Sequence, residues 1–92
     1  MNGRIESYIH SDNITKAKGG SLVKITSDTE SGARTDEFQA FCKLVASRAY
    51  AAQAQDWQGI TDVFPDLEEQ RAQLSKLLRE TINVESIAIL AL

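Results

Sequence analysis

Few residues of this chain have the type and spacing that catalysis or metal binding requires. His10 is the only histidine and Cys42 the only cysteine, so neither a thiolate metal cage nor a disulfide within the chain can form. His10 ends an alternating segment, where it could orient a partner. Cys42 falls on an apolar helical stripe, which favours a buried, inert thiol. We therefore expect no enzymatic activity, no cofactor and no metal; a site assembled from His10, Tyr8 and loop acids is the weakest alternative.

Charge and glycine placement argue against nucleotides and nucleic acids. The pair Gly19 and Gly20 lacks the lysine and hydroxyl of a phosphate loop, and it precedes a strand rather than a helix. The net charge is -3, with 10 basic and 13 acidic residues, whereas phosphate binding needs concentrated Lys and Arg. Lys16 and Lys18 form too small a basic group and are interpreted as part of a solvated loop. No apolar run matches a secretory signal or a membrane span, which predicts a cytoplasmic protein without membrane contact.

The remaining sequence pattern predicts one domain, residues 1–92, that contains a small sheet. Residues 4–10 alternate as a half-buried strand does, with Ile5, Ser7 and Ile9 on one side and Glu6, Tyr8 and His10 on the other. Residues 22–26 form a second β-branched run, and residues 84–90 a third. The first two strands are expected to pair as an antiparallel hairpin with a long polar tip.

Two helices are expected between the second and third strands. Thr35 is the predicted N-cap of the first, which carries one apolar stripe and fades near Gln53. The second begins near Pro65, with Asp66 and Glu69 spaced like a capping box, and ends at Asn83. Its predicted buried residues are Leu67, Ala72, Leu74, Leu77 and Leu78.

The connecting segments complete the predicted architecture. Residues 27–34 are expected to form an exposed loop, while residues 53–62 could carry an extra turn of helix. Trp57, in the latter stretch, either anchors a partner or lies in the core under the second helix. The prediction is an α+β fold of order β-β-α-α-β, with a three-stranded antiparallel sheet and both helices packed on one face.

Three stretches, in this order and spacing, are similar to one known family. They are residues 3–10 (Gly-Arg-Ile-Glu-Ser-Tyr-Ile-His), 20–25 (Gly-Ser-Leu-Val-Lys-Ile) and 33–38 (Ala-Arg-Thr-Asp-Glu-Phe). They resemble the core, or dimerisation, domain of elongation factor Ts. The resemblance extends from Gly3 to about Ala52, and residues 74–90 are similar to the helix-then-strand end of a core subdomain. It implies one of the two related halves of that core, without the family's N-terminal helical module or coiled-coil insertion.

The resemblance also implies a binding segment. In the family, a Thr-Asp-Phe-Val loop enters the GTPase domain of elongation factor Tu, disturbs its magnesium site and speeds GDP release. Here Glu30 keeps the acidic charge, Ser31 replaces the aromatic wedge, and Gly32 is expected to loosen the residues after it. The partner-binding residues implied are Thr29, Glu30, Ser31, Gly32, Arg34 and His10.

Two functions are suggested by this resemblance as hypotheses. The first is a translation protein of the elongation factor Ts type that binds elongation factor Tu or a related GTPase and promotes GDP release. The alternative is a non-catalytic interaction module, either a homodimer or a subunit of a larger complex. A two-fold dimer is expected because residues 87–92 form an apolar strand end that nothing guards.

Overall fold

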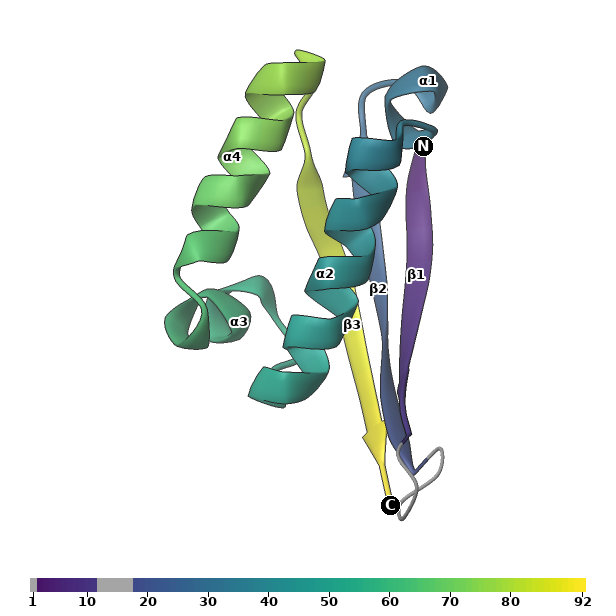
Figure 1. Ribbon diagram of the computed structural model, residues 1–92, viewed down its shortest axis with the longest axis vertical. Coiled ribbons are helices and arrows are strands. Elements are labelled where there is room, and N and C mark those ends of the chain that lie inside the picture. Colours follow the sequence, from purple (N-terminus) through teal and green to yellow (C-terminus); the bar gives the residue numbers. More distant parts are fainter. Residues whose placement is uncertain (1, 12–17) are drawn as a thin grey trace.

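The computed structural model describes residues 2–11 and 18–92 of the chain and has the predicted α+β class (Figure 1). The elements follow in the order β1 (Asn2–His10), β2 (Gly19–Ser27), α1 (Glu30–Ala33), α2 (Asp36–Ala52), α3 (Trp57–Val63), α4 (Asp66–Leu78) and β3 (Asn83–Ala91). Within the described residues there are therefore four helical segments where two were expected. The predicted hairpin tip, including Lys16, lies outside the described residues.

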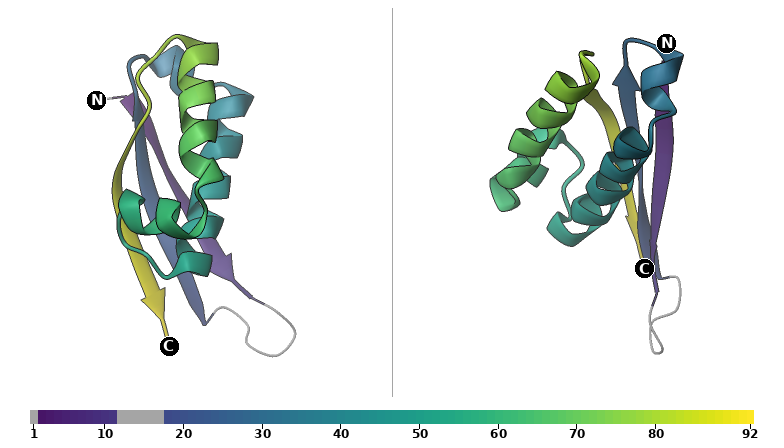
Figure 2. Two further views of the ribbon diagram at one scale, coloured as in Figure 1. Left: turned by 90° about the vertical axis from the view of Figure 1, so that its left-hand side faces the viewer. Right: turned by 45° about the horizontal axis from the view of Figure 1, so that its top comes forward.

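The sheet is three-stranded and fully antiparallel, as predicted, with the order β1-β2-β3. β2 is central, so β1 and β3 are both edge strands; Ile5 pairs with Lys24, and Leu22 with Ala88. A register shift between Lys24 and Ile25 interrupts the pairing of β2 with β3. The helices lie on one face of the sheet, and the other face is open (Figure 2).

The alternation predicted for β1 is confirmed, and its polar side is the one that faces the helices. Glu6, Tyr8 and His10 are half-buried, whereas Ile5 and Ile9 are exposed on the open face. Arg4 can lie on the helix side because its Nε pairs with the Glu6 carboxylate at 2.7 Å. A partly buried charge is tolerated when it is paired in this way. The open face therefore carries apolar side chains that a typical soluble sheet would bury.

The long helix α2 supplies most of the core, as its apolar stripe predicted. The stripe is buried throughout and consists of Phe38, Phe41, Cys42, Val45, Ala46 and Ala49. Thr35 is the N-cap, because its hydroxyl accepts from the Phe38 amide at 3.2 Å. The helix ends at Gln53, whose left-handed backbone (φ 52°) stops the helical hydrogen bonding. This stripe packs on Val23 and Ile25 of β2.

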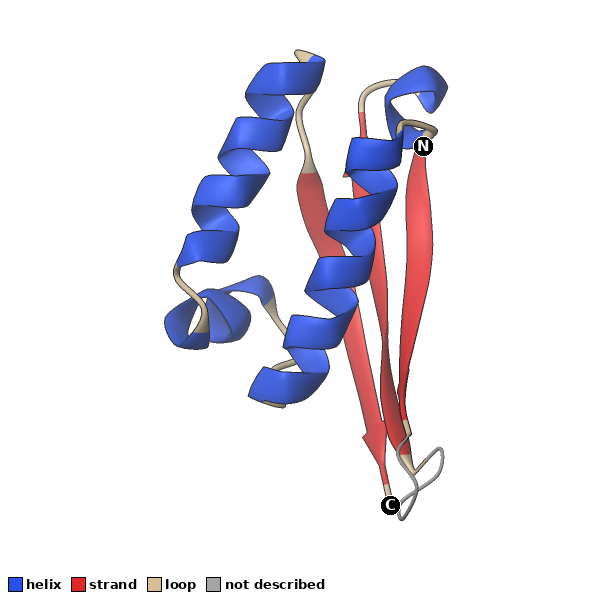
Figure 3. Cartoon of the chain, in the orientation of Figure 1, coloured by secondary structure: helices blue, strands red, loops and turns tan. Residues whose placement is uncertain are grey.

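Helix α4 differs from its prediction in several respects (Figure 3). It begins after Pro65 as expected, but the capping box is wrong, because the Asp66 carboxylate instead accepts from the side-chain amide of Gln70. It ends at Leu78, so Asn83 opens β3 rather than closing the helix. Leu67 and Leu74 are buried, while Leu77 is 67% exposed and Ala72 is also exposed. α4 therefore buries only a narrow stripe, and it packs chiefly against α2 and α3.

The two connecting segments are more ordered than the sequence predicted. Residues 27–34 include the helical turn α1, in which Gly32 and Ala33 are buried, so the prediction of an exposed loop was wrong there. Residues 57–63 form α3, which confirms the extra helical turn allowed for residues 53–62, and Asp56 caps it by accepting from the Gly59 amide at 2.7 Å. In the described part of the chain, no helix has both the length and the apolar character needed to cross a membrane.

Candidate functional site

The candidate site is the 29–34 segment, which follows β2 at the end of the sheet where β1 begins (Figure 1). Thr29 is the N-cap of α1, and its hydroxyl accepts from the Gly32 amide at 3.0 Å. The Ala33 amide donates to the Thr29 carbonyl and the Arg34 amide to the Glu30 carbonyl. These bonds close one helical turn, so the segment has a defined shape rather than that of an open loop.

A carboxylate from the other end of the chain holds this turn. Glu80 lies in the connection between α4 and β3, 51 residues from Thr29. Its Oε1 accepts from the Thr29 amide at 2.9 Å, and its Oε2 accepts from the Thr29 hydroxyl at 2.7 Å. Nearby, Asp28 Oδ2 accepts from the Thr81 amide at 2.7 Å. The site therefore depends on two chain segments that are distant in sequence.

The Glu80 carboxylate occupies the space in which a side chain at position 32 would otherwise lie. A Cβ atom built on Gly32 would collide with both carboxylate oxygens of Glu80. The residue is buried and lies within the turn, where its amide is bonded to Thr29. The expectation that Gly32 loosens the segment is therefore not what the structure shows, because the glycine admits the carboxylate that fixes the turn.

Besides Thr29, whose hydroxyl is bonded to Glu80, the exposed residues of the segment are Glu30, Ser31 and Arg34. The Glu30 carboxylate and the Arg34 guanidinium form an ion pair at 3.3 Å, with their side chains 62% and 77% exposed. A pair this exposed contributes little to stability and can re-pair with charges on a partner. Ser31 is also exposed. These three side chains are the ones that a docking protein would meet first.

His10 lies at the opposite end of the sheet from the segment. Eight residue steps along β1 separate it from Asn2, a distance of roughly 26 Å. Its Nδ1 is 2.9 Å from the Tyr8 hydroxyl, and its ring stacks on Tyr50 with centroids 5.1 Å apart. The five segment residues that the sequence singled out are thus brought together, and His10 is not among them.

Cys42 and His10 are the side chains of the described residues with the greatest potential reactivity. Burial raises the pKa of the Cys42 thiol to about 12, so at neutral pH it is a protonated core residue. Among the described residues, His10 has the Tyr8 hydroxyl as a hydrogen-bond partner. Among residues 2–11 and 18–92, no three His, Cys, Asp or Glu side chains are grouped so that they could hold a metal ion.

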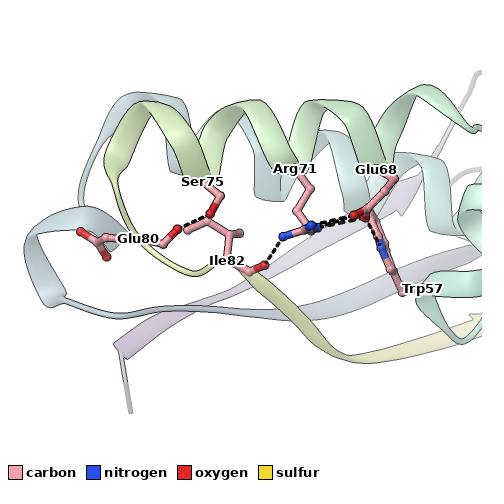
Figure 4. Close-up of polar contacts among 6 residues, drawn as sticks. All are labelled: Trp57, Glu68, Arg71, Ser75, Glu80 and Ile82. Atoms are coloured by element: carbon pink, nitrogen blue, oxygen red, sulfur yellow. Dashed lines mark hydrogen bonds and ion pairs between the residues drawn. The ribbon is translucent and has the colours of Figure 1, made fainter.

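Trp57 is a structural residue in this fold. It is half-buried against Phe41, with ring centroids 6.4 Å apart, and its Nε1 donates to Glu68 at 2.8 Å (Figure 4). Arg71 also donates to Glu68, at 2.6 Å, and to the Ile82 carbonyl at 2.9 Å. The hydrogen bond from Arg71 is the main cause that lowers the pKa of Glu68. This network, which we call the Arg71 network, joins α3, α4 and Ile82, the residue before β3.

Sequence reasoning missed Glu80. It follows the end of α4 at Leu78, in a stretch that the sequence predicted to be helical as far as Asn83, and no role was predicted for it. Its partner Thr29 is 51 residues away, and no local pattern connects the two. The one available signal was Gly32, since a glycine inside a short helical turn indicates that something approaches its Cα closely.

Comparison with known proteins agrees with the resemblance. The chain is 41% identical over 51 residues to the chloroplastic elongation factor Ts of Cyanidium caldarium. This stretch is 55% of the present chain and 23% of that relative, so the chain corresponds to a minor part of its length. No protein-family model matches the chain. The match supports an elongation factor Ts-like segment within this protein.

Proposed function

We propose that this chain is a translation protein that binds elongation factor Tu, or a related translational GTPase, through the 29–34 segment. The observation that carries the proposal is the shape of that segment, a fixed turn with Glu30, Ser31 and Arg34 directed to solvent. The similarity to a chloroplastic elongation factor Ts supports a role in translation. Acceleration of GDP release would require only binding and displacement at the GTPase, without bond chemistry in this chain.

The residue at position 31 limits how strongly the segment acts. An aromatic side chain there would place a large apolar surface in a pocket, whereas the hydroxymethyl group of Ser31 offers very little. Loss of a buried aromatic anchor commonly weakens an interface by about 2 kcal/mol or more. We therefore propose a weak complex and slow exchange, with Glu30 supplying the main charged contact.

Release of a fluorescent GDP analogue from elongation factor Tu tests this proposal. Ser31→Phe is expected to speed release, because position 31 is exposed and accepts a ring without disturbing the core. Glu30→Ala is expected to slow it. Glu69→Ala, on the exposed face of α4, is the matched control and leaves the rate unchanged. If the wild type and every variant give the rate measured without added protein, the exchange function is refuted.

A second candidate function is self-association, and the open face of the sheet favours it. Ile5, Ile9, Leu22 and Leu90 are all more than half exposed on that face. Ile9, Leu22 and Leu90 line an open groove of about 570 Å³. Ile87 and Ile89, which the sequence placed in an unguarded edge, are half-buried instead. We propose that a dimer, where it forms, stacks these faces rather than pairing strand edges.

Sedimentation of the wild type and two lysine variants tests the dimer. Leu22→Lys places a charge in the centre of the open face and is expected to give a monomer. Leu77→Lys is the matched control, because Leu77 is as exposed as Ile5 but lies on α4, away from this face. A wild-type monomer at high micromolar concentration would rule the dimer out.

A further inference from the structure

Glu80 makes contacts that reach both the backbone and the cap of the candidate site. We propose that Glu80 is the positioning residue of the 29–34 segment and that Gly32 is its steric counterpart. This inference rests on the proposed function, because it concerns the orientation in which Glu30, Ser31 and Arg34 meet a partner. Glu80 itself need not touch that partner.

The Thr29 hydroxyl shows how Glu80 acts. A hydroxyl has one proton to donate, and here the geometry gives it to Glu80 Oε2 at 2.7 Å. Its lone pairs are then free to accept from the Gly32 amide at 3.0 Å, which caps α1. The Thr29 amide donates to the other carboxylate oxygen, so the whole residue is fixed. Because a four-residue helix is not stable alone, its shape depends on such outside contacts.

Glu80 is in turn held by the end of α4. Arg79 adopts a left-handed backbone (φ 57°), which reverses the chain after the helix. The Glu80 amide donates to the Ser75 carbonyl at 3.1 Å, and the Ser75 hydroxyl donates to the Glu80 carbonyl. In Figure 4 the Glu80 carboxylate points away from Ser75, which leaves it available for Thr29. The carboxylate is thus presented from an anchored backbone.

Gly32 completes the arrangement. Any larger residue at position 32 would occupy the space of the Glu80 carboxylate, so the two positions are coupled. This coupling distinguishes a positioning role of Glu80 from a general contribution of Glu80 to stability. If Glu80 merely added stability, substitutions at positions 32 and 80 would act independently. If it occupies the space beside Gly32, removing the carboxylate makes room for a side chain there.

Amide hydrogen exchange measures the segment without any partner. In Glu80→Ala, the amides of Gly32, Ala33 and Arg34 are expected to exchange about tenfold faster, as for loss of one charge-assisted hydrogen bond. Amides of the core helix α2 serve as the internal reference and should change much less. Glu80→Gln keeps one acceptor for the Thr29 amide and is expected to lie between the wild type and Glu80→Ala.

A double-mutant cycle of Gly32→Ala and Glu80→Ala supplies the decisive comparison. Gly32→Ala alone is expected to speed exchange in the segment, and in the Glu80→Ala background it should have no such effect or slow exchange. Equal effects in both backgrounds would overturn the inference, as would wild-type exchange rates in Glu80→Ala. GDP release is measured on the same variants: a wild type without activity refutes the proposed function, while hydrogen exchange still decides the role of Glu80.

Discussion

Replacement of Arg71 by methionine tests the energetics of the fold most directly. Arg71 donates to the carbonyl of the buried Ile82 at 2.9 Å and forms an ion pair with Glu68 (Figure 4). Methionine keeps much of the aliphatic stem, so the change removes mainly the polar contacts. A hydrogen bond from a charged donor contributes about 1.5 kcal/mol, and a half-exposed ion pair about 0.5 kcal/mol. Arg71→Met should therefore cost about 2 kcal/mol at pH 7.

The pH dependence of the free energy of unfolding separates the hydrogen bond to Ile82 from the ion pair with Glu68. The pKa of Glu68 is lowered chiefly by the hydrogen bond from Arg71. A carboxyl with a lowered pKa in the folded state stabilises the fold above its unfolded pKa of about 4.3, and this stabilisation is lost as pH falls through the folded pKa. The cost of Arg71→Met should then shrink by about 0.5 kcal/mol in acid, because the side chain of Glu68, 48% exposed, is neutral in both proteins.

Two measurements check this prediction. Urea denaturation at pH 7 and in acid gives the free energies of unfolding, with Lys76→Met as the control on the exposed side of α4. Trp57 is the only tryptophan and donates to Glu68, so its fluorescence reports the protonation of that carboxyl. The midpoint of this titration should rise in Arg71→Met. A loss below 0.5 kcal/mol at pH 7, or an unchanged midpoint, would refute the role assigned to the Arg71 network.

Three further outcomes are expected. Gly32→Val should lower the melting temperature by about 10 °C through its clash with Glu80, whereas Ser31→Val in the same turn should change it little; equal shifts would contradict the steric argument. Thr35→Ala should cost about 1 kcal/mol in urea denaturation, since it removes the cap of α2; an unchanged midpoint would contradict it. Cys42 should resist thiol reagents at pH 8 until the protein unfolds, and rapid labelling of the native protein would refute the burial argument. Because the pKa of this thiol is raised in the folded state, the wild type should lose stability as pH rises above the unfolded thiol pKa of about 8.5, and should lose more than Cys42→Ala does.

Much of the fold was predictable because its signals are local. The stripe of α2 repeats at helical spacing, and Thr35 is a cap residue three positions before Phe38, so the helix and its start were predicted correctly. The strand at β1 was likewise indicated by its alternation. Which side of β1 meets the helices was not indicated, because Ile5 and Ile9 are the more apolar set and yet face outward.

The errors occurred where tertiary contacts decide the structure. Leu77 has the spacing of a buried residue, but α4 meets the core along Leu67, Leu74 and the half-buried Leu78, and nothing in its own segment shows this. The helix was extended to Asn83 because Arg79 carries no glycine signal, although its left-handed backbone ends the helix. In the candidate site, Thr29 was found by resemblance, while its partner Glu80 lies in a part of the chain where the resemblance was slight.

Within the 29–34 segment, one set of residues serves the fold and another forms the surface. Gly32 is buried beside the Glu80 carboxylate, and Thr29, although exposed, is hydrogen-bonded to that carboxylate. Ser31 and the Glu30–Arg34 pair face outward and contribute little to the fold. Substitutions at position 31 can therefore change the affinity for a partner without altering the shape of the turn. A serine at position 31 is thus compatible with an intact fold, and the shape held by Glu80 presents whichever residue stands there.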